Sequence, residues 1–249
     1  MKIISVLNQK GGVAKTTSTL ALGAALRDKG KRVLFIDLDP QRDLSKVVLA
    51  DLSQISVFEV LTRKAKAAQA IQRTAQGDII PSSLALAADG ILTATGKEYR
   101  LREALEPLRE AYDFILIDCP PSLGVLSVNA LTAADGCIIP AQADVLSLEA
   151  LGTFYQTYEV IKQYTNPALE LLGVVITRYN GRSVLSRDMA DLIEARAEEL
   201  GTKLYKTRIR ECTALKEAQA VRESVYQYAP KSNAVKDYNS LLKEILGDI

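Results

Sequence analysis

The decapeptide Asn8-Gln-Lys-Gly-Gly-Val-Ala-Lys-Thr-Thr17 decides the fold of this chain. It follows a short apolar run at residues 2–7 and precedes a helical pattern over residues 16–29. A glycine-rich turn between a strand and a helix lets backbone N–H groups converge on phosphate oxygens, and the helix N-terminus adds partial positive charge. The stretch therefore predicts a nucleotide-phosphate cradle, in which Lys15 reaches the β and γ phosphates and Thr16 ligates Mg²⁺.

The spelling of this loop departs from the common GxxxxGK(S/T) pattern, because Gln9 and Ala14 stand at its two glycine positions. It matches a deviant form, KGGx(G/A)K(S/T)T, in which an additional lysine, here Lys10, precedes the glycine pair. We expect nucleotide binding to be retained, although Ala14 adds a Cβ that strains the backbone if its φ is positive. The alternative is a glycine turn that caps a helix beside incidental lysines. The residues assigned to the nucleotide here are Lys10, Gly11, Gly12, Val13, Ala14, Lys15, Thr16 and Thr17.

Two carboxylates follow the apolar run at residues 32–37, in the order Asp37-Leu-Asp39-Pro40. Side chains alternate along a strand, so Asp37 and Asp39 are expected to project from the same face. In a parallel sheet this end of the strand borders the crevice beside the phosphate loop. One carboxylate is then placed to position a water on the γ phosphate, while the other supports metal or switch contacts. An isolated Asp-x-Asp pair would more often indicate a turn.

A third carboxylate, Asp118, ends the apolar run at residues 114–118 and precedes Cys119-Pro120-Pro121. This is the placement of a Walker B carboxylate, which holds Mg²⁺ directly or through water. The alternative, an aspartate that caps a helix beginning near Ser122, is compatible with the metal role. The predicted metal ligands are Thr16, Asp39 and Asp118.

Short apolar runs alternate with longer helical patterns along nearly the whole chain, which is typical of βαβ units around a mostly parallel, twisted sheet with helices on both faces. The predicted strands are residues 2–7, 32–37, 78–81, 114–118, 136–140 and 171–177, and the predicted helices are residues 16–29, 99–111, 122–134, 147–164, 183–200 and 235–246. Residues 62–77 are polar and rich in alanine, and we expect a surface helix there in preference to a linker. We predict a single α/β P-loop domain over residues 1–249, with no N-terminal helix-turn-helix extension.

Composition limits the chemistry. The 249 residues carry 31 lysines and arginines against 30 acids, so any polyanion binding must come from local clusters. The absence of histidine excludes a serine-histidine triad and a histidine zinc site. The three cysteines fit neither a disulfide framework nor a CxxC metal site, and we expect plain thiols.

No apolar run is long enough to span a membrane and no signal peptide is visible, which predicts a cytoplasmic protein.

Three motifs in order, at residues 10–17, 37–41 and 118–122, closely resemble the ParA/Soj ATPases, the partition branch of the deviant-Walker group that also contains MinD. The resemblance covers nearly the whole chain and continues through blocks at residues 139–149, 175–178 and 228–238, although many members carry proline and arginine at Arg210 and Glu211. It implies an ATPase that uses ATP and Mg²⁺ and forms an ATP-dependent homodimer. It further implies non-specific double-stranded DNA as a partner and a ParB-like protein that stimulates hydrolysis and releases the dimer. The location would be the nucleoid when ATP is bound.

The resemblance also assigns roles to single residues. Lys10 would reach across the dimer interface to the partner subunit's nucleotide, and Thr17 would touch the α phosphate. Asp39 would orient the attacking water, and the block that ends at Arg178 would contribute to the nucleotide site. The expected catalytic residues are Lys10, Lys15, Asp37 and Asp39.

A DNA surface is expected in the last third of the chain. Residues 178–236 contain twelve lysines and arginines against eight acids, a surplus of four. Such clusters suit sequence-independent phosphate contacts that weaken with salt, and dimerisation would join two weak patches on one duplex. A solvated face is the alternative. The predicted DNA contacts are Arg182, Lys203, Lys206, Arg208, Arg210, Lys216 and Arg222.

The rival functions share the nucleotide residues. A MinD-like switch on a membrane, or a cargo-positioning ATPase on a protein assembly, is the main alternative, but a membrane switch needs a basic amphipathic C-terminal helix. Residues 237–249 carry more acid than base, and core packing explains their apolar stripe. An iron-sulfur reductase would need paired cysteines, and an ATP-dependent ligase would need polar insertions that the sequence lacks. The sequence does not specify whether the cargo is a plasmid, a chromosome origin or a protein assembly.

Overall fold

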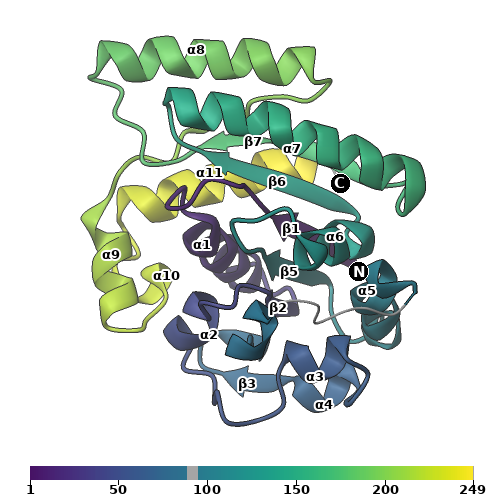
Figure 1. The fold of residues 1–249 in the computed structure, drawn as a ribbon. Helices are drawn as coiled ribbons and strands as arrows, with labels where there is room; N and C mark the ends of the chain where they lie inside the picture. Colours follow the sequence, from purple (N-terminus) through teal and green to yellow (C-terminus); the bar gives the residue numbers. More distant parts are fainter. Residues whose placement is uncertain (89–94, 249) are drawn as a thin grey trace.

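A twisted sheet runs through the middle of the molecule (Figure 1). The computed structural model describes residues 1–88 and 95–248. Within them the sheet has seven strands in the order β3-β4-β2-β5-β1-β6-β7, all parallel to their neighbours except β3, which is antiparallel to β4. The strands are β1 (Lys2–Val6), β2 (Val33–Asp37), β3 (Gln72–Thr74), β4 (Gly77–Ile80), β5 (Phe114–Asp118), β6 (Gly136–Ala141) and β7 (Glu170–Ile176).

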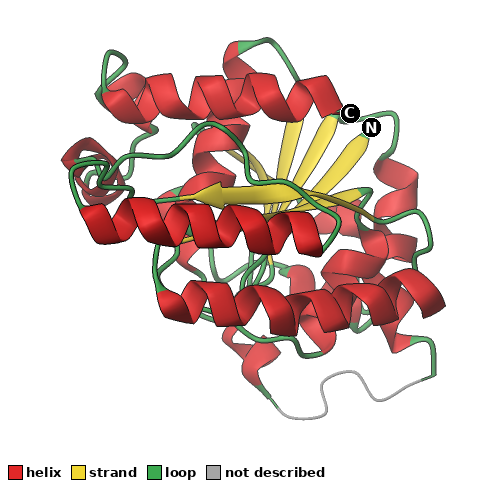
Figure 2. Cartoon of the chain, turned by 90° about the horizontal axis from the view of Figure 1, so that it is seen from above, coloured by secondary structure: helices red, strands yellow, loops and turns green. Residues whose placement is uncertain are grey.

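Helices cover both faces of the sheet, as the apolar strands require (Figure 2). Alternate residues of β2 belong to different cores: Leu34 and Ile36 pack on one side, while Val33 and Phe35 pack on the other. The first core is covered by α3 (Val57–Leu61), α4 (Ala67–Ala70), α5 (Arg100–Leu105), α6 (Val125–Ala133), α7 (Val145–Tyr164) and α8 (Val184–Glu199). The second is covered by α1 (Lys15–Asp28), α2 (Asp43–Val47) and α11 (Asn233–Asp248). The predicted fold class is confirmed.

The remaining short helices are η1 (Leu84–Ala87), η2 (Lys97–Tyr99), η3 (Glu106–Leu108), α9 (Thr213–Ala220) and α10 (Val225–Tyr228). The helix expected over residues 99–111 is divided into η2, α5 and η3. Pro107, which has no backbone N–H to donate, lies in η3 just after the end of α5. None of the helices in the described residues combines the length and apolar character needed to cross a membrane.

The prediction of one surface helix over residues 62–77 is wrong. Only α4 is helical there, and the chain then turns back as β3 along the edge of β4. Thr74 Oγ1 donates a hydrogen bond to the carbonyl of Gly77 at 2.7 Å, and Gly77 takes a φ of 137°, which favours glycine. After α4, the backbone of residues 72–74 therefore forms strand hydrogen bonds with β4 in place of the expected helix.

The strand register places the predicted site residues together. Val6, the last residue of β1, lies beside Asp118 of β5, and Asp37 of β2 lies on the other side of Asp118. The phosphate loop and two of the three carboxylates therefore meet at the carboxyl ends of three neighbouring strands, where ligands of open α/β sheets bind.

Candidate nucleotide site

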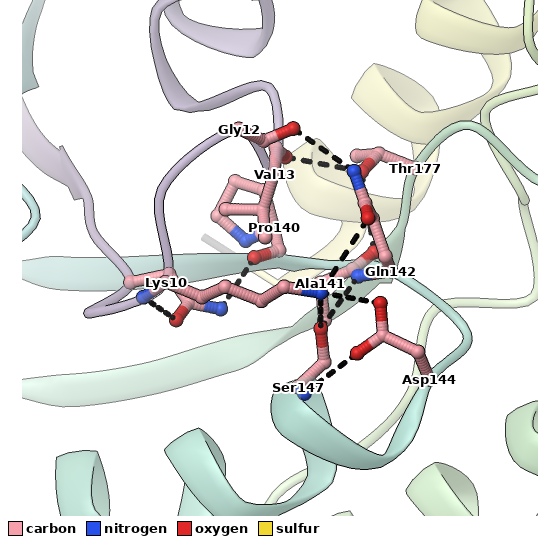
Figure 3. A network of polar contacts seen from close by, with 10 residues as sticks. Lys10, Gly12, Val13, Pro140, Ala141, Gln142, Asp144, Ser147 and Thr177 are labelled. Carbon is pink, nitrogen blue, oxygen red and sulfur yellow. Dashed lines mark hydrogen bonds and ion pairs between the residues drawn. The ribbon is translucent and has the colours of Figure 1, made fainter.

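The phosphate loop joins β1 to α1 in a tight, partly left-handed path. Gly12 has a φ of 76° and Ala14 a φ of 66°. A non-glycine residue in this region costs roughly 1–2 kcal/mol, so the strain expected from the Ala14 Cβ is present. Hydrogen bonds fix the loop from outside: Thr177 Oγ1 donates to the Val13 carbonyl at 3.0 Å, and Gln142 Nε2 donates to the Gly12 carbonyl at 2.9 Å (Figure 3).

Lys15, the first residue of α1, is 8% exposed. Its Nζ donates to the Lys10 carbonyl at 3.2 Å. Burial lowers the pKa of the Lys15 ammonium, and the carboxylates of Asp118 and Asp39 offset only part of this effect. A buried ammonium beside a turn of backbone N–H groups is the arrangement that a phosphate would stabilise.

Asp118 carries the observation that most favours a metal ion. Thr16 Oγ1 donates to its Oδ2 at 2.6 Å, while its Oδ1 is buried without a hydrogen-bond partner. Burial raises the pKa of the Asp118 carboxyl well above its usual range, Asp37 adds to the rise, and the Thr16 hydroxyl opposes it. An unsatisfied buried carboxylate oxygen is costly, and Mg²⁺ with its water shell would satisfy it.

The described residues contain no group of three or more carboxylate, histidine or cysteine side chains that could hold a metal by themselves. Mg²⁺ in nucleotide sites usually takes one or two protein ligands and completes its shell with phosphate and water. The Thr16 hydroxyl and the unpartnered Oδ1 of Asp118 fit a Mg²⁺–nucleotide complex of this kind.

The two carboxylates after β2 have different surroundings. Asp37 is fully buried; its Oδ2 accepts from the Ser45 N–H at 2.9 Å and from Ser45 Oγ at 2.6 Å, and its Oδ1 accepts from the Asp39 N–H at 3.1 Å. Burial raises the pKa of Asp37 to about 7, although the bonds from Ser45 act in the opposite direction. Asp39 is half-buried and lines the hollow beside the phosphate loop. The structure thus separates the pair: Asp39 reaches the site, and Asp37 positions the segment that carries it.

Lys10 is not among the residues that line this hollow. Its ammonium forms an ion pair with Asp144 and lies 3.5 Å from both Gln142 Oε1 and Ser147 Oγ (Figure 3). Asp144 is also the N-cap of α7 and accepts from the Ser147 N–H at 2.9 Å. Burial acts to raise the pKa of Asp144, but Lys10 and Ser147 outweigh it and hold this pKa below its usual value. We call this contact the Lys10–Asp144 latch.

The hollow has a volume of about 510 Å³, in the range of a small-molecule site. Its far wall is formed by Arg178 after β7, by Glu211 in the segment that precedes α9, and by Lys216 of α9. Glu211 Oε1 accepts from Lys216 Nζ at 3.1 Å and from an Arg178 terminal nitrogen at 3.4 Å, and these cations lower the pKa of Glu211. Gln219 Nε2 donates to Thr17 Oγ1 at 2.9 Å and so joins α9 to the phosphate loop.

Sequence reasoning missed several of these contacts. Nothing in the local pattern singles out Gln219 or Ser45, because both act across long sequence separations or on a buried partner. Asp144 lies in the block at residues 139–149 that resembles the ParA/Soj ATPases, so the sequence does point to this segment. It does not indicate the ion pair between Asp144 and Lys10.

Several of the predicted DNA contacts lie on one extended segment. Residues 204–210 run as an extended segment beside β7, with Leu204 paired to Val174 and Arg210 paired to Tyr179, so their side chains are spread along its length. Arg210 forms a bidentate ion pair with the buried carboxylate of Asp237, with Nε–Oδ2 at 2.9 Å.

Among the other predicted contacts, Lys216 faces the nucleotide hollow, Arg208 approaches Glu194 at 3.9 Å, and Lys203 lies 5.2 Å from the centre of the Tyr205 ring. Arg182, Lys206 and Arg222 are exposed, and in the part of the chain that the structure describes no carboxylate pairs with their side chains.

Comparison with known proteins agrees with this geometry. A sequence model of a family described as an AAA domain matches residues 1–171. The chain is 38% identical to the sporulation initiation inhibitor protein Soj of Bacillus subtilis, over 98% of each chain. It is 37% identical to the chromosome partitioning protein ParA of Caulobacter vibrioides, over 99% of this chain and 94% of that protein.

Among solved structures, the fold is similar to that of cobyrinic acid a,c-diamide synthase from Mycobacterium smegmatis with bound ADP and magnesium. The TM-score is 0.86 and the identity 36%, over 99% of this chain and 94% of that one.

Proposed function

The chain belongs to the ParA/Soj family of ATPases, and from this premise we propose that it is an ATP-dependent DNA partition ATPase. In this proposal the ATP-bound dimer binds double-stranded DNA without sequence preference, and hydrolysis stimulated by a ParB-like partner releases it. The protein would act in the cytoplasm, on the nucleoid while ATP is bound.

The unpartnered Oδ1 of Asp118 beside the Thr16 hydroxyl is the observation that supports the ATPase part of the proposal, because Mg²⁺ beside the phosphate loop would satisfy this oxygen. Mg²⁺ bound there would neutralise charge on the β and γ phosphates. Lys15 would hold the same phosphates from inside the loop. Asp39 would orient the attacking water, and Asp37, through the backbone N–H groups of Asp39 and Ser45, would keep Asp39 in place.

Lys10 would act on the nucleotide of the partner subunit. In the single chain the Lys10–Asp144 latch holds its ammonium on the N-terminus of α7, away from its own hollow. Dimerisation would require this ion pair to be exchanged for a contact with phosphate. The latch would then set part of the free energy that ATP must supply to join two subunits.

DNA binding would rest on those predicted contacts that are exposed and lack an acidic partner among the described residues, namely Arg182, Lys206 and Arg222. Arg210 and Lys216, which are held by Asp237 and Glu211, are less available for phosphate contacts. Two copies of a weak patch on one duplex gain effective concentration, so nucleotide-dependent dimerisation would control DNA binding.

ATP turnover with Mg²⁺ tests the site assignment. Lys15→Ala should lose nucleotide binding, and Asp39→Ala should bind ATP but lose most of its turnover, about a hundredfold or more. Asp43→Ala is the matched control, because Asp43 also lines the hollow but pairs with Lys46. Normal turnover by Asp39→Ala would remove Asp39 from its role.

The similarity to a structure described as a diamide synthase favours a second candidate, an ATP-dependent amide ligase. That activity needs a second substrate beside the γ phosphate. Turnover that depends on a carboxylic acid and an amine donor, and not on DNA, would favour the ligase. Turnover stimulated by DNA together with a partner protein would favour partition.

A further inference from the structure

A second hollow, of about 660 Å³, lies between the turn that joins α3 to α4 and the helical segment of α5 and η3. It shares no lining residue with the nucleotide hollow. Figure 1 places α3 and α4 together, with α5 beside them, away from α9. We call it the α3–α5 groove; its lining includes Val60, residues 63–69, Arg100, Glu103, Ala104, Pro107 and Leu108.

The groove is strongly cationic. Arg63, Lys64, Lys66 and Arg100 line it, and Glu103 is the one acid among its lining residues. Glu103 already pairs with Arg63 at 2.5 Å, in a bridge that joins the two walls. The Glu103 carboxylate therefore neutralises only Arg63, and the other three cations leave the groove with a surplus of positive charge.

Two of the cations lack compensation. Within residues 1–88 and 95–248, no acidic side chain pairs with Lys66 or Arg100. The Nε atom of Arg100 is in addition buried without a hydrogen-bond partner. A buried donor without an acceptor is costly, and a carboxylate in the groove would balance the charge of this guanidinium.

Apolar side chains form another part of the lining. The part of this lining that is open to solvent comes from Ala65, Ala68, Ala104 and Pro107, while Val60, Ala67 and Leu108 are buried beneath it. Phosphate contacts along a duplex need charge but no apolar surface. A segment that alternates acidic and apolar side chains matches both parts of the lining.

We propose that the α3–α5 groove is a docking site for an acidic, partly apolar peptide segment of a partner protein, separate from the nucleotide site. Carboxylates of the segment would pair with Lys66 and Arg100, and its apolar side chains would pack on Ala68, Ala104 and Pro107. The Arg63–Glu103 bridge offers a third position, because an incoming carboxylate can replace Glu103 on Arg63.

The test selects peptides from a random 12-residue library on the intact chain and measures the affinity of a selected, labelled peptide by fluorescence anisotropy. The expected peptides combine aspartate or glutamate with leucine, phenylalanine or tryptophan. The double variant Lys66→Gln/Arg100→Gln should bind at least tenfold more weakly. The matched control Lys231→Gln/Lys236→Gln, which removes two exposed cations elsewhere, should bind within twofold of the unmodified chain.

Lys66→Glu alone serves as a second variant if the double variant melts at a lower temperature. Lys15→Ala should bind the selected peptide with the same affinity as the unmodified chain, which would show that peptide binding does not depend on the nucleotide site. The proposal is overturned if selected peptides are not acidic, if the groove variants bind them normally, or if millimolar inorganic phosphate displaces them completely, which would indicate a simple ion site.

Discussion

Asp144→Asn isolates the Lys10–Asp144 latch, because asparagine caps a helix as well as aspartate but carries no charge. The Lys10 and Asp144 side chains are 19% and 38% exposed, so the ion pair is partly screened and contributes about 1 kcal/mol. Two latches break when two subunits join, which gives about 2 kcal/mol, or about a thirtyfold change in an equilibrium constant. Asp144→Asn should therefore tighten the nucleotide-bound dimer by about thirtyfold.

Sedimentation velocity with a non-hydrolysable ATP analogue and Mg²⁺ measures the dimer dissociation constant directly. Asp113→Asn is the matched control, since Asp113 pairs with Arg32 at a similar exposure of 34%. The pKa of Asp144 in the folded chain lies below the ordinary pKa of an aspartate. The Lys10–Asp144 latch is therefore fully formed above that ordinary pKa and weakens only when the pH falls through the lower, folded-state pKa. The effect of Asp144→Asn on the dimer should thus be constant from pH 6 to 8. A dimer that is unchanged or weaker in Asp144→Asn would refute the latch.

Three further predictions concern stability, measured by urea unfolding. Gly23→Ala should destabilise the chain by about 1–3 kcal/mol, because the added Cβ would lie 2.2 Å from a ring carbon of the buried Phe35; an unchanged midpoint would contradict this packing. Ala14→Gly should stabilise it by about 1 kcal/mol by relieving the positive φ, and a loss of stability would show that the loop is not strained. Asp37, with its pKa raised to about 7, binds its proton more tightly in the folded chain, so stability without nucleotide should fall as the pH rises from 5 to 7, with a slope of the order of 1 kcal/mol per unit. Asp37→Asn should reduce that slope, and Asp118, whose pKa is also raised by burial, would account for what remains. A slope that is unchanged in Asp37→Asn would place the titration elsewhere.

The sequence was sufficient for the features that depend on local order along the chain. The phosphate loop, the runs that became β2 and β5, and the carboxylates at their ends follow from period-two alternation and from the fixed place of a helix after a glycine turn. The different surroundings of Asp37 and Asp39 could not be predicted in the same way. The strand ends at Asp37, so the alternation of side chains no longer determines the direction of Asp39. The hydrogen bond from Ser45 to the buried Asp37 is likewise not indicated by the local sequence.

Tertiary contacts decided the rest. The cations at residues 203–210 lie within eight residues of one another, but an extended segment spreads them along its length, and Asp237, 27 residues further along, binds Arg210. Residues 62–77 have a helical composition, yet the unpaired edge of β4 gives their backbone hydrogen bonds a better partner. Neither outcome is visible in a local window, because the partner that decides it is remote.

Binding to random-sequence duplex DNA, without nucleotide, with ADP and with ATP and Mg²⁺, at 50 and 200 mM salt, tests the central claim most directly. Three phosphate contacts from each subunit, at Arg182, Lys206 and Arg222, give six in a dimer and predict about a thousandfold loss of affinity between the two salt concentrations. The account predicts binding only with ATP and Mg²⁺, and its loss in Lys15→Ala. Equal binding in all nucleotide states, or none in any, would contradict an ATP-controlled DNA partition ATPase.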